Sequence, residues 1–436
     1  MRRVVNRIKK KRLLYTLLLL LLFGLTGCQL RSGEELMAAP VPSGAPAELR
    51  QALRPVLKKG ETFCAPDAGE NRQSILFSDL DGDGQEEAVV LLQNTKDRTP
   101  TVSVYRQTDG QYVEVGRKSG CGFGFSRVEL APLDNNPGAE IVVTCGLSAQ
   151  TDQALAVLSL QDGVLSVVLT DVCTDFVMLA SENGQQLVTV QTGKTARLYR
   201  FSSAPTENAD TVKKVPLSDR IERLIQVQSG RLTETIPAVF VTGTDGEGTV
   251  VTQVLSVQDG VPRNLGAVSS EGAVGACPLP RDIDGDGILE LPKCFPLPQR
   301  GDEAFSLVKW MKLDRKGKPA PCCTTFHQTP EGWYLTIPEK WNDQIAVSVC
   351  SESGGTGCEI LQTRQGEEPL PIVSILVFTG ENRSTYGASE GRFILTEKGD
   401  RTYSAELGTS AWANLLSQDE VKELFHNDIE YHSDLQ

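Results

Sequence analysis

Three acidic loops at regular spacing constrain the fold of this chain more than any other feature. They read SDLDGDGQEE at residues 78–87, APLDNNPGAE at residues 131–140 and RDIDGDGILE at residues 281–290. Aligned on their final glutamates, the first two loops lie 53 residues apart, and the first and last lie 203 apart, close to four such steps. Self-similarity at this period predicts successive copies of one supersecondary unit.

Two copies without the acids complete the series. ENGQQLVTVQTG begins at Glu182 and TETIPAVFVTG begins at Thr233, and each continues into a β-rich run. An Asp-Gly pair follows in three of the units, at residues 109–110, 162–163 and 259–260. Asp-Gly between apolar residues predicts a hairpin turn. One unit is therefore expected to contain strand, loop, strand, spacer, strand, turn and strand.

Four antiparallel strands in about fifty residues is the size of a propeller blade. We expect a mainly β chain with a five-bladed β-propeller of four-stranded antiparallel blades over residues 61–327, its last blade completed by strands from both ends. The units resemble FG-GAP/VCBS repeats, the blades of integrin alpha-chain-type propellers. The whole chain resembles clostridial lipoproteins that combine a propeller with a C-terminal domain.

The crowded carboxylates predict bound calcium, because like charges this close repel unless a cation joins them and Ca²⁺ takes six to eight oxygen ligands. In loop one the expected ligands are the side chains of Asp79, Asp81, Asp83 and Glu87, with the backbone carbonyl of Gln85. Gly82 and Gly84 permit the tight turn. In the family resembled, ligands come from these same positions, usually with Asp where Glu87 stands.

Loop five repeats this scheme, so two structural calcium sites are expected. Its ligands are the side chains of Asp282, Asp284, Asp286 and Glu290, with the backbone carbonyl of Ile288. Loop two has Pro132 at the first position and keeps only Asp134, Asn136 and Glu140, which predicts a weak site at most. The alternative is that Asp and Gly serve only as turn formers.

The first residues resemble a bacterial lipoprotein signal. A basic segment precedes an apolar run from Leu13 to Gly27, and LTGC at residues 25–28 resembles a lipobox, which implies a diacylated Cys28. We expect a signal peptide over residues 1–27, a tether over 28–46 and a short helical segment over 47–60. The implied location is the extracytoplasmic face of the cell membrane, held by lipid. The alternatives are a plain signal peptide or an uncleaved anchor.

Charge argues against a nucleic-acid partner. The first 27 residues hold seven Lys and Arg and no Asp or Glu, so removing them changes the formal net charge from −13 to −20. A chain this acidic repels the phosphate backbone of nucleic acids.

We expect the protein to be a monomer.

Eleven cysteines in an exported chain permit disulfides. Lipid on Cys28 leaves an even number. The expected pairs are Cys350 with Cys358, Cys277 with Cys294, and Cys121 with Cys145. The alternative is buried free thiols. A zinc site is disfavoured because the chain has no Cys-x-x-Cys pair and only three histidines.

From residue 328 the pattern changes, and residues 328–436 predict a small α+β domain. Its helix is expected to begin at Ser417, with Glu420 completing a capping box.

For function we expect a tethered binding or scaffolding module with a protein or glycan ligand. An exported glycan hydrolase or lyase is the alternative, or a sensor domain for a membrane partner. No histidine precedes His327, which excludes a His-dependent triad from the repeats.

Overall fold

The computed structural model describes residues 45–427, apart from residues 56, 121, 135, 148–151, 182–183, 202–210, 271–276, 299–302, 342, 353 and 390. The chain divides into two compact units, residues 1–57 and 58–436. In the first unit, helix α3 (Ala45–Leu53) ends shortly before Pro55, whose ring is incompatible with a continuing helix. The predicted signal peptide and Cys28 lie outside the described residues.

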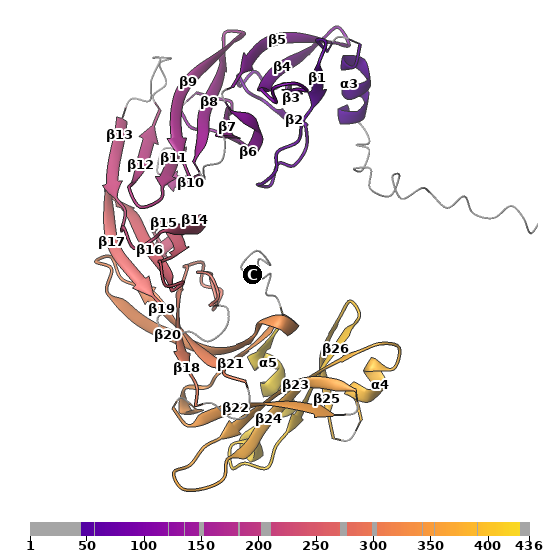
Figure 1. Cartoon of the computed structure of the whole chain (residues 1–436), viewed down its shortest axis with the longest axis vertical. Coiled ribbons are helices and arrows are strands. Elements are labelled where there is room, and N and C mark those ends of the chain that lie inside the picture. Colours follow the sequence, from indigo (N-terminus) through magenta and orange to yellow (C-terminus); the bar gives the residue numbers. More distant parts are fainter. Residues whose placement is uncertain are drawn as a thin grey trace, which may run out of the picture. The chain divides into compact units, whose positions relative to one another are not determined.

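The second unit is mainly β and contains six antiparallel sheets (Figure 1). Sheet one contains β1 (Glu61–Phe63), β2 (Ile75–Ser78), β3 (Glu87–Asn94), β4 (Pro100–Thr108) and β5 (Gln111–Ser119). Sheet two contains β6 (Phe123–Ala131), β7 (Glu140–Gly146), β8 (Gln153–Gln161) and β9 (Val164–Cys173). Sheet three contains β10 (Asp175–Ser181), β11 (Gly184–Gln191), β12 (Thr195–Arg200) and β13 (Thr211–Pro216). Sheet four contains β14 (Arg223–Thr233), β15 (Ile236–Thr244), β16 (Val250–Gln258) and β17 (Val261–Ser269).

Sheet five departs from this regular order. It contains β18 (Leu291–Pro296), β19 (Ser306–Leu313), β20 (Pro319–Gln328), β21 (Trp333–Thr336) and β27 (Phe425–His426). Before β18, a single backbone bridge between Arg281 and Glu290 replaces the first strand of the repeat. The two added strands, β21 and β27, both follow the repeats in sequence, so the expectation that strands from both ends complete this sheet is not met.

The Asp-Gly turns form as the sequence predicts. In all three pairs the aspartate and the glycine both have positive φ, between 49° and 77°. This is the type I′ geometry whose twist matches the flanking strands. The turns join β4 to β5, β8 to β9 and β16 to β17.

Each pair of successive sheets in the second unit buries a hydrophobic cluster of its own. Strand β7 shows how the alternation works: Ile141 and Val143 pack with sheet one, whereas Val142 packs with sheet three. Because successive side chains in a strand point to opposite faces, one strand contributes to two cores. Further clusters join sheet three to sheet four and sheet four to sheet five.

Sheet six forms most of the C-terminal part. It contains β22 (Ile345–Glu352), β23 (Gly355–Gln362), β24 (Leu370–Thr379), β26 (Arg401–Leu407) and β25 (Phe393–Lys398), and appears in orange to yellow in Figure 1. The helices here are α4 (Arg383–Gly387), α5 (Gln418–Leu424) and the 3₁₀ turns η1 (Thr329–Glu331), η2 (Glu339–Trp341) and η3 (Ala413–Leu415). The predicted capping box of α5 is confirmed, since Ser417 and Glu420 bond each other's backbone N–H. One core cluster runs from Phe326 in sheet five into sheet six.

None of the described helices combines the length and the apolar composition that a membrane span requires.

Candidate functional site

Each acidic loop ends on a buried glutamate that bonds to the backbone near the start of the same loop. One carboxylate oxygen accepts the N–H of the residue seven positions earlier. The N···O distances are 3.0 Å from Leu80 to Glu87, 2.8 Å from Leu133 to Glu140 and 2.9 Å from Ile283 to Glu290. The three glutamates are only 0%, 5% and 0% exposed. The final glutamate therefore closes the loop whether or not the other acids are present.

Loop one brings three predicted ligands together. Carboxylate oxygens of Asp79, Asp81 and Glu87 lie within 4.8 Å of one another. Asp79 also accepts the N–H groups of both loop glycines, at 2.7 and 3.0 Å, which orients its carboxylate. Asp83 instead accepts the N–H of Gln85 at 2.8 Å and does not join the group.

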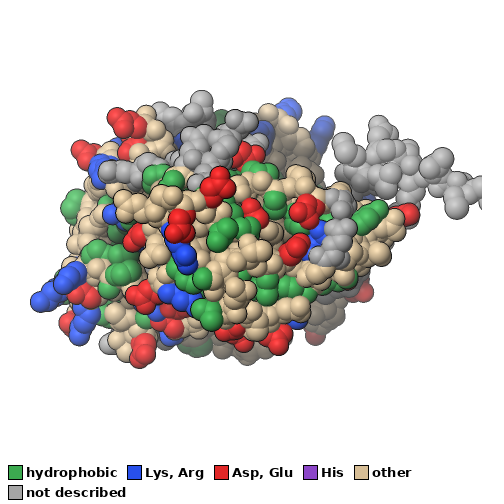
Figure 2. Space-filling model, turned by 90° about the horizontal axis from the view of Figure 1, so that it is seen from below, with side chains coloured by type: hydrophobic (Ala, Val, Ile, Leu, Met, Phe, Trp, Pro, Cys, Tyr) green, Lys and Arg blue, Asp and Glu red, His purple; other side chains and the backbone are tan. Residues whose placement is uncertain are grey.

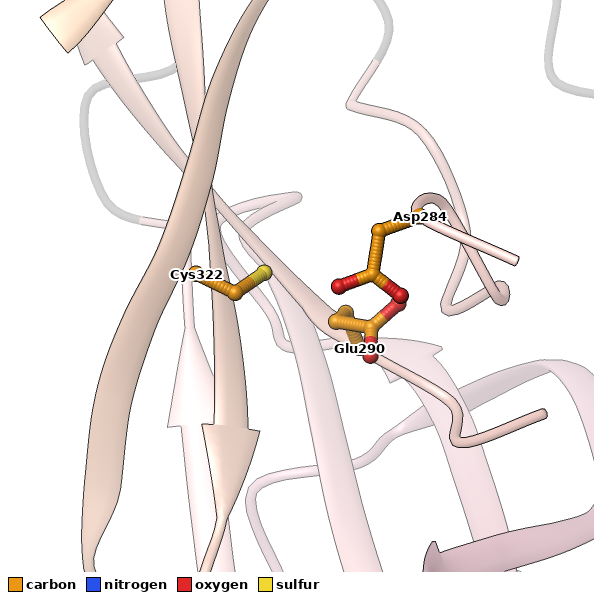
Figure 3. Close-up of side chains that lie close together, drawn as sticks. All are labelled: Asp284, Glu290 and Cys322. Carbon is orange, nitrogen blue, oxygen red and sulfur yellow. The ribbon is translucent and has the colours of Figure 1, made fainter. Parts of the chain in front are cut away.

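Loop five brings together all three of its aspartates, Asp282, Asp284 and Asp286, within 4.8 Å. A second group overlaps the first and adds the sulfur of Cys322, which the sequence analysis missed and which approaches from β20 (Figure 3). Its sulfur points toward the carboxylates of Asp284 and Glu290. Ile288, the predicted carbonyl ligand, donates its N–H to Asp286 at 2.9 Å.

A basic side chain from a neighbouring strand enters each of these two loops. Arg106 on β4 pairs with Asp81 and, at 2.9 Å, with Glu87. Lys312 on β19 pairs with Asp286 and, at 2.7 Å, with Asp284. Burial works against the charge of Lys312, yet its hydrogen bonds to these carboxylates raise its pKa. Part of the crowded negative charge is thus neutralised within the chain, which the sequence analysis did not foresee.

The donor chemistry of both loops nonetheless fits a divalent cation. Apart from the sulfur of Cys322 at loop five, the converging groups are hard carboxylate oxygens, the type that Ca²⁺ prefers. In loop five, Oε1 of the fully buried Glu290 has no hydrogen-bond partner among the described residues, and Lys312 Nζ lies 3.6 Å from it. Burial raises the pKa of Glu290 to about 7. A cation bound close to this oxygen would stabilise the charged form of the buried carboxylate.

Loop two has the same closure without a comparable carboxylate group among its described residues. Asp134 accepts the backbone N–H of Asn136 at 2.7 Å, and the hydroxyl of Ser159 donates to Glu140 at 3.3 Å. Ser159 thus replaces the basic partner that the other two loops have. Burial raises the pKa of Glu140 to about 7, against the opposing effect of its bond from Leu133.

Loops one and two contact each other through two glycines. A Cβ at Gly82 would lie 2.5 Å from Pro137, and a Cβ at Gly138 would lie 2.5 Å from the carbonyl oxygen of Leu80. Both glycines have positive φ, so this approach needs residues without side chains.

The predicted cysteine pairs have different outcomes. Cys277 and Cys294 do meet, as buried free thiols with their sulfurs 2.9 Å apart. In the β22–β23 register, Cys350 lies opposite Gly357, one position from Cys358, so the two side chains point to opposite faces of the sheet. This arrangement does not bring their sulfurs together, and both thiols are free. The pair of Cys121 with Cys145 lies partly outside the described residues.

A cleft lies where sheets three and four meet. It encloses about 810 Å³, within the range of small-molecule sites. Its walls come from the end of β10, from β14 with the turn into β15, and from the Asp259-Gly260 turn after β16. Arg315, in the turn between β19 and β20, completes the lining. The sequence analysis missed this feature because its residues come from separate repeats.

The two described histidines, His327 and His426, both make contacts within sheet five. Burial lowers the pKa of His327 to about 3, and its Nε2 shares a hydrogen bond with Thr325 at 2.7 Å. His426 stacks on Tyr334 with ring centroids 4.5 Å apart. On the face shown in Figure 2, acidic and basic side chains are interspersed, without a continuous basic patch among the described residues.

Comparisons with known proteins give no family. No protein-family model matches the chain, and no curated protein matches it significantly. A protein from Lactobacillus plantarum of solved structure shares 8% identity and a TM-score of 0.29, over 68% of this chain and 82% of its own. The exotype rhamnogalacturonan lyase YesX shares 15% identity and a TM-score of 0.25, over 71% of this chain and 55% of the lyase.

The rhamnogalacturonan lyase YesW shares 15% identity and a TM-score of 0.26, over 72% of this chain and 53% of the lyase. The chain thus spans about half the length of the two lyases. TM-scores this low support no inference about chemistry or ligand.

The raised pKa of Glu140 predicts how stability depends on pH at loop two. A carboxyl whose pKa rises from 4.5 to about 7 on folding stabilises the protein fully below 4.5, and this contribution is lost as pH rises through 7. Glu140→Gln retains an acceptor for Leu133 without the charge. We expect a free energy of unfolding close to wild type at pH 4.5 and higher by roughly 1–3 kcal/mol at pH 8.

Denaturant unfolding at the two pH values measures this difference. Glu381→Gln, which removes a charge from an exposed position, serves as the control and is expected to leave the pH profile unchanged. Superimposable profiles for Glu140→Gln and wild type would contradict the assignment.

Proposed function

We propose that the chain is a binding module held by lipid on the extracytoplasmic face of the cell membrane. The observation that carries this proposal is the cleft of about 810 Å³ at the junction of sheets three and four. Its lining comes from strand ends and short turns, elements that a packed sheet holds in fixed positions. A preformed recess of this size suits recognition of a small ligand or a short segment of a larger one.

We propose that the first five sheets are the blades of one propeller. Support comes from the strand order shared by the first four and from the separate hydrophobic cluster between each successive pair. Calcium at loops one and five then stabilises two of these blades. The converging carboxylates and the orphaned oxygen of Glu290 support this assignment.

Binding through the cleft is tested with glycan and protein arrays. Ser229 is exposed in the cleft wall on β14, so Ser229→Trp fills the recess without entering the core. We expect a ligand retained by wild type to lose most of its binding to this variant. Thr409→Trp, an equally large change at an exposed residue outside the cleft, is the control. If Ser229→Trp and Thr409→Trp retain the ligand equally well, the binding surface lies outside the cleft.

Calcium binding is tested by melting curves with chelator and with added calcium. A ligand that binds only the folded state stabilises it by about 2.7 kcal/mol at a hundredfold excess over Kd. The double change Asp81→Ala with Asp284→Ala is expected to abolish most of this response, whereas Asp134→Ala leaves it intact. Magnesium is expected to restore stability poorly, since it demands a smaller and more regular shell.

Variants of the two basic residues that pair with the loop carboxylates give a second test of calcium binding. Arg106→Met and Lys312→Met remove a competing positive charge, so each is expected to lower stability in chelator and to raise calcium affinity. If chelator leaves the melting temperature unchanged in wild type and in both variants, the loops do not bind calcium. Arg106 and Lys312 are then the positive charges that neutralise the carboxylates.

Lipid attachment is tested separately. We expect the full-length chain to partition into the detergent phase and Cys28→Ser to leave an unprocessed precursor or a released protein. Wild type recovered without lipid, starting near residue 28, would overturn this part of the proposal.

A further inference from the structure

Positive side chains gather around the cleft of a strongly acidic chain. Arg200, Arg231 and Arg315 line it, against two carboxylates, those of Glu234 and Asp259. At the rim, Lys213 donates from Nζ to the backbone carbonyl of Gly260. Within the lining cations outnumber acids three to two, whereas the chain as a whole carries a net charge of −13.

The three cleft arginines are free of the pairing that other arginines in this structure show. None of them has a hydrogen bond or ion pair from its side chain to any described residue. By contrast, Arg117 and Arg197 pair with carboxylates at 2.6 and 2.8 Å. A guanidinium presents up to five donors in a planar fork, and the described residues occupy none of them in these three arginines.

Secondary structure fixes the backbone positions from which these three arginine side chains extend. Arg200 is the last residue of β12, and Arg231 lies within β14. The turn that carries Arg315 is tied to β16, because the buried Gln258 donates from Nε2 to the carbonyl of Arg315 at 2.8 Å. Gln258 is thus a positioning residue for the third arginine.

The rest of the lining indicates the kind of molecule that carries the negative charge. Gln186 lines the cleft and is 7% exposed, yet its side-chain amide has no hydrogen bond to a described residue. An amide offers both donors and an acceptor. Its polar groups suit a ligand that carries hydrogen-bonding groups beside its charge.

We infer that the cleft binds an oxyanion, a carboxylate or phosphate on a ligand with further hydrogen-bonding groups, through Arg200, Arg231 and Arg315. Guanidinium groups bind both oxyanions by paired, charge-assisted hydrogen bonds. Gln186 hydrogen-bonds the uncharged part of the same ligand. This inference rests on the proposed binding function and specifies its ligand.

Isothermal titration of the purified extracytoplasmic chain with defined probes tests the inference. The anionic probes are trigalacturonate, citrate and inorganic phosphate, and fully methyl-esterified trigalacturonate is the matched neutral probe. We expect at least one anionic probe to bind, with affinity falling as salt rises. The double change Arg200→Gln with Arg231→Gln is expected to weaken that binding about tenfold or more.

A second double variant controls for net charge. Arg223→Gln with Arg263→Gln removes two exposed positive charges outside the cleft and is expected to bind as wild type does. The probes also identify the ligand chemistry: binding of trigalacturonate or citrate without phosphate indicates carboxylate, and the reverse indicates phosphate.

Three results would overturn the inference: no binding of any anionic probe, equal binding of the esterified and the acidic trisaccharide, or equal losses in the two double variants. The proposed function survives the second of these if Ser229→Trp still abolishes binding of the neutral probe.

Discussion

The hydrogen bond from a backbone N–H to a buried glutamate at the end of each acidic loop is the interaction on which the rest of the site depends. It joins positions seven residues apart and recurs at Glu87, Glu140 and Glu290. A buried N–H without a partner costs about 1–3 kcal/mol, so the bond stabilises the chain reversal before the next strand. With the reversal fixed, Asp79 and Asp81 converge in loop one, and Asp282, Asp284 and Asp286 converge in loop five.

Carboxylates held this close repel one another, and the chain reduces this repulsion in two ways. In loops one and five, Arg106 and Lys312 reach across from a neighbouring strand and place a positive charge among the carboxylates. In loop two most of the acids are absent, and Ser159 suffices as a partner for Glu140. In the proposed function calcium would compete with these basic side chains for the same oxygens, and the balance between them would set how strongly each loop depends on the ion.

The third and fourth repeats, which lack the acidic loop, have a different role from the others in the proposed function. Sheets three and four lack the acidic loop, and the cleft lies where these two sheets meet. Three arginines line it beside two carboxylates. Like-charge repulsion from a DxDGDG loop would oppose an anionic ligand at this position. Loss of the acids from the middle repeats is therefore consistent with a division of roles, with stabilising loops toward the two ends of the repeats and ligand recognition between them.

The sequence by itself determined the local order of strands and turns. Asp-Gly pairs such as Asp109-Gly110 specify a turn through backbone φ, and the continuous apolar run Ile141, Val142, Val143 specifies a strand buried on both faces. Ser417 and Glu420 fixed the start of α5 for the same local reason. Only the tertiary structure decided which side chains from separate strands meet. Lys312 and Cys322 reach Asp284, and Arg200, Arg231 and Arg315 surround one cleft, through strand register and sheet packing, which no short stretch of sequence encodes.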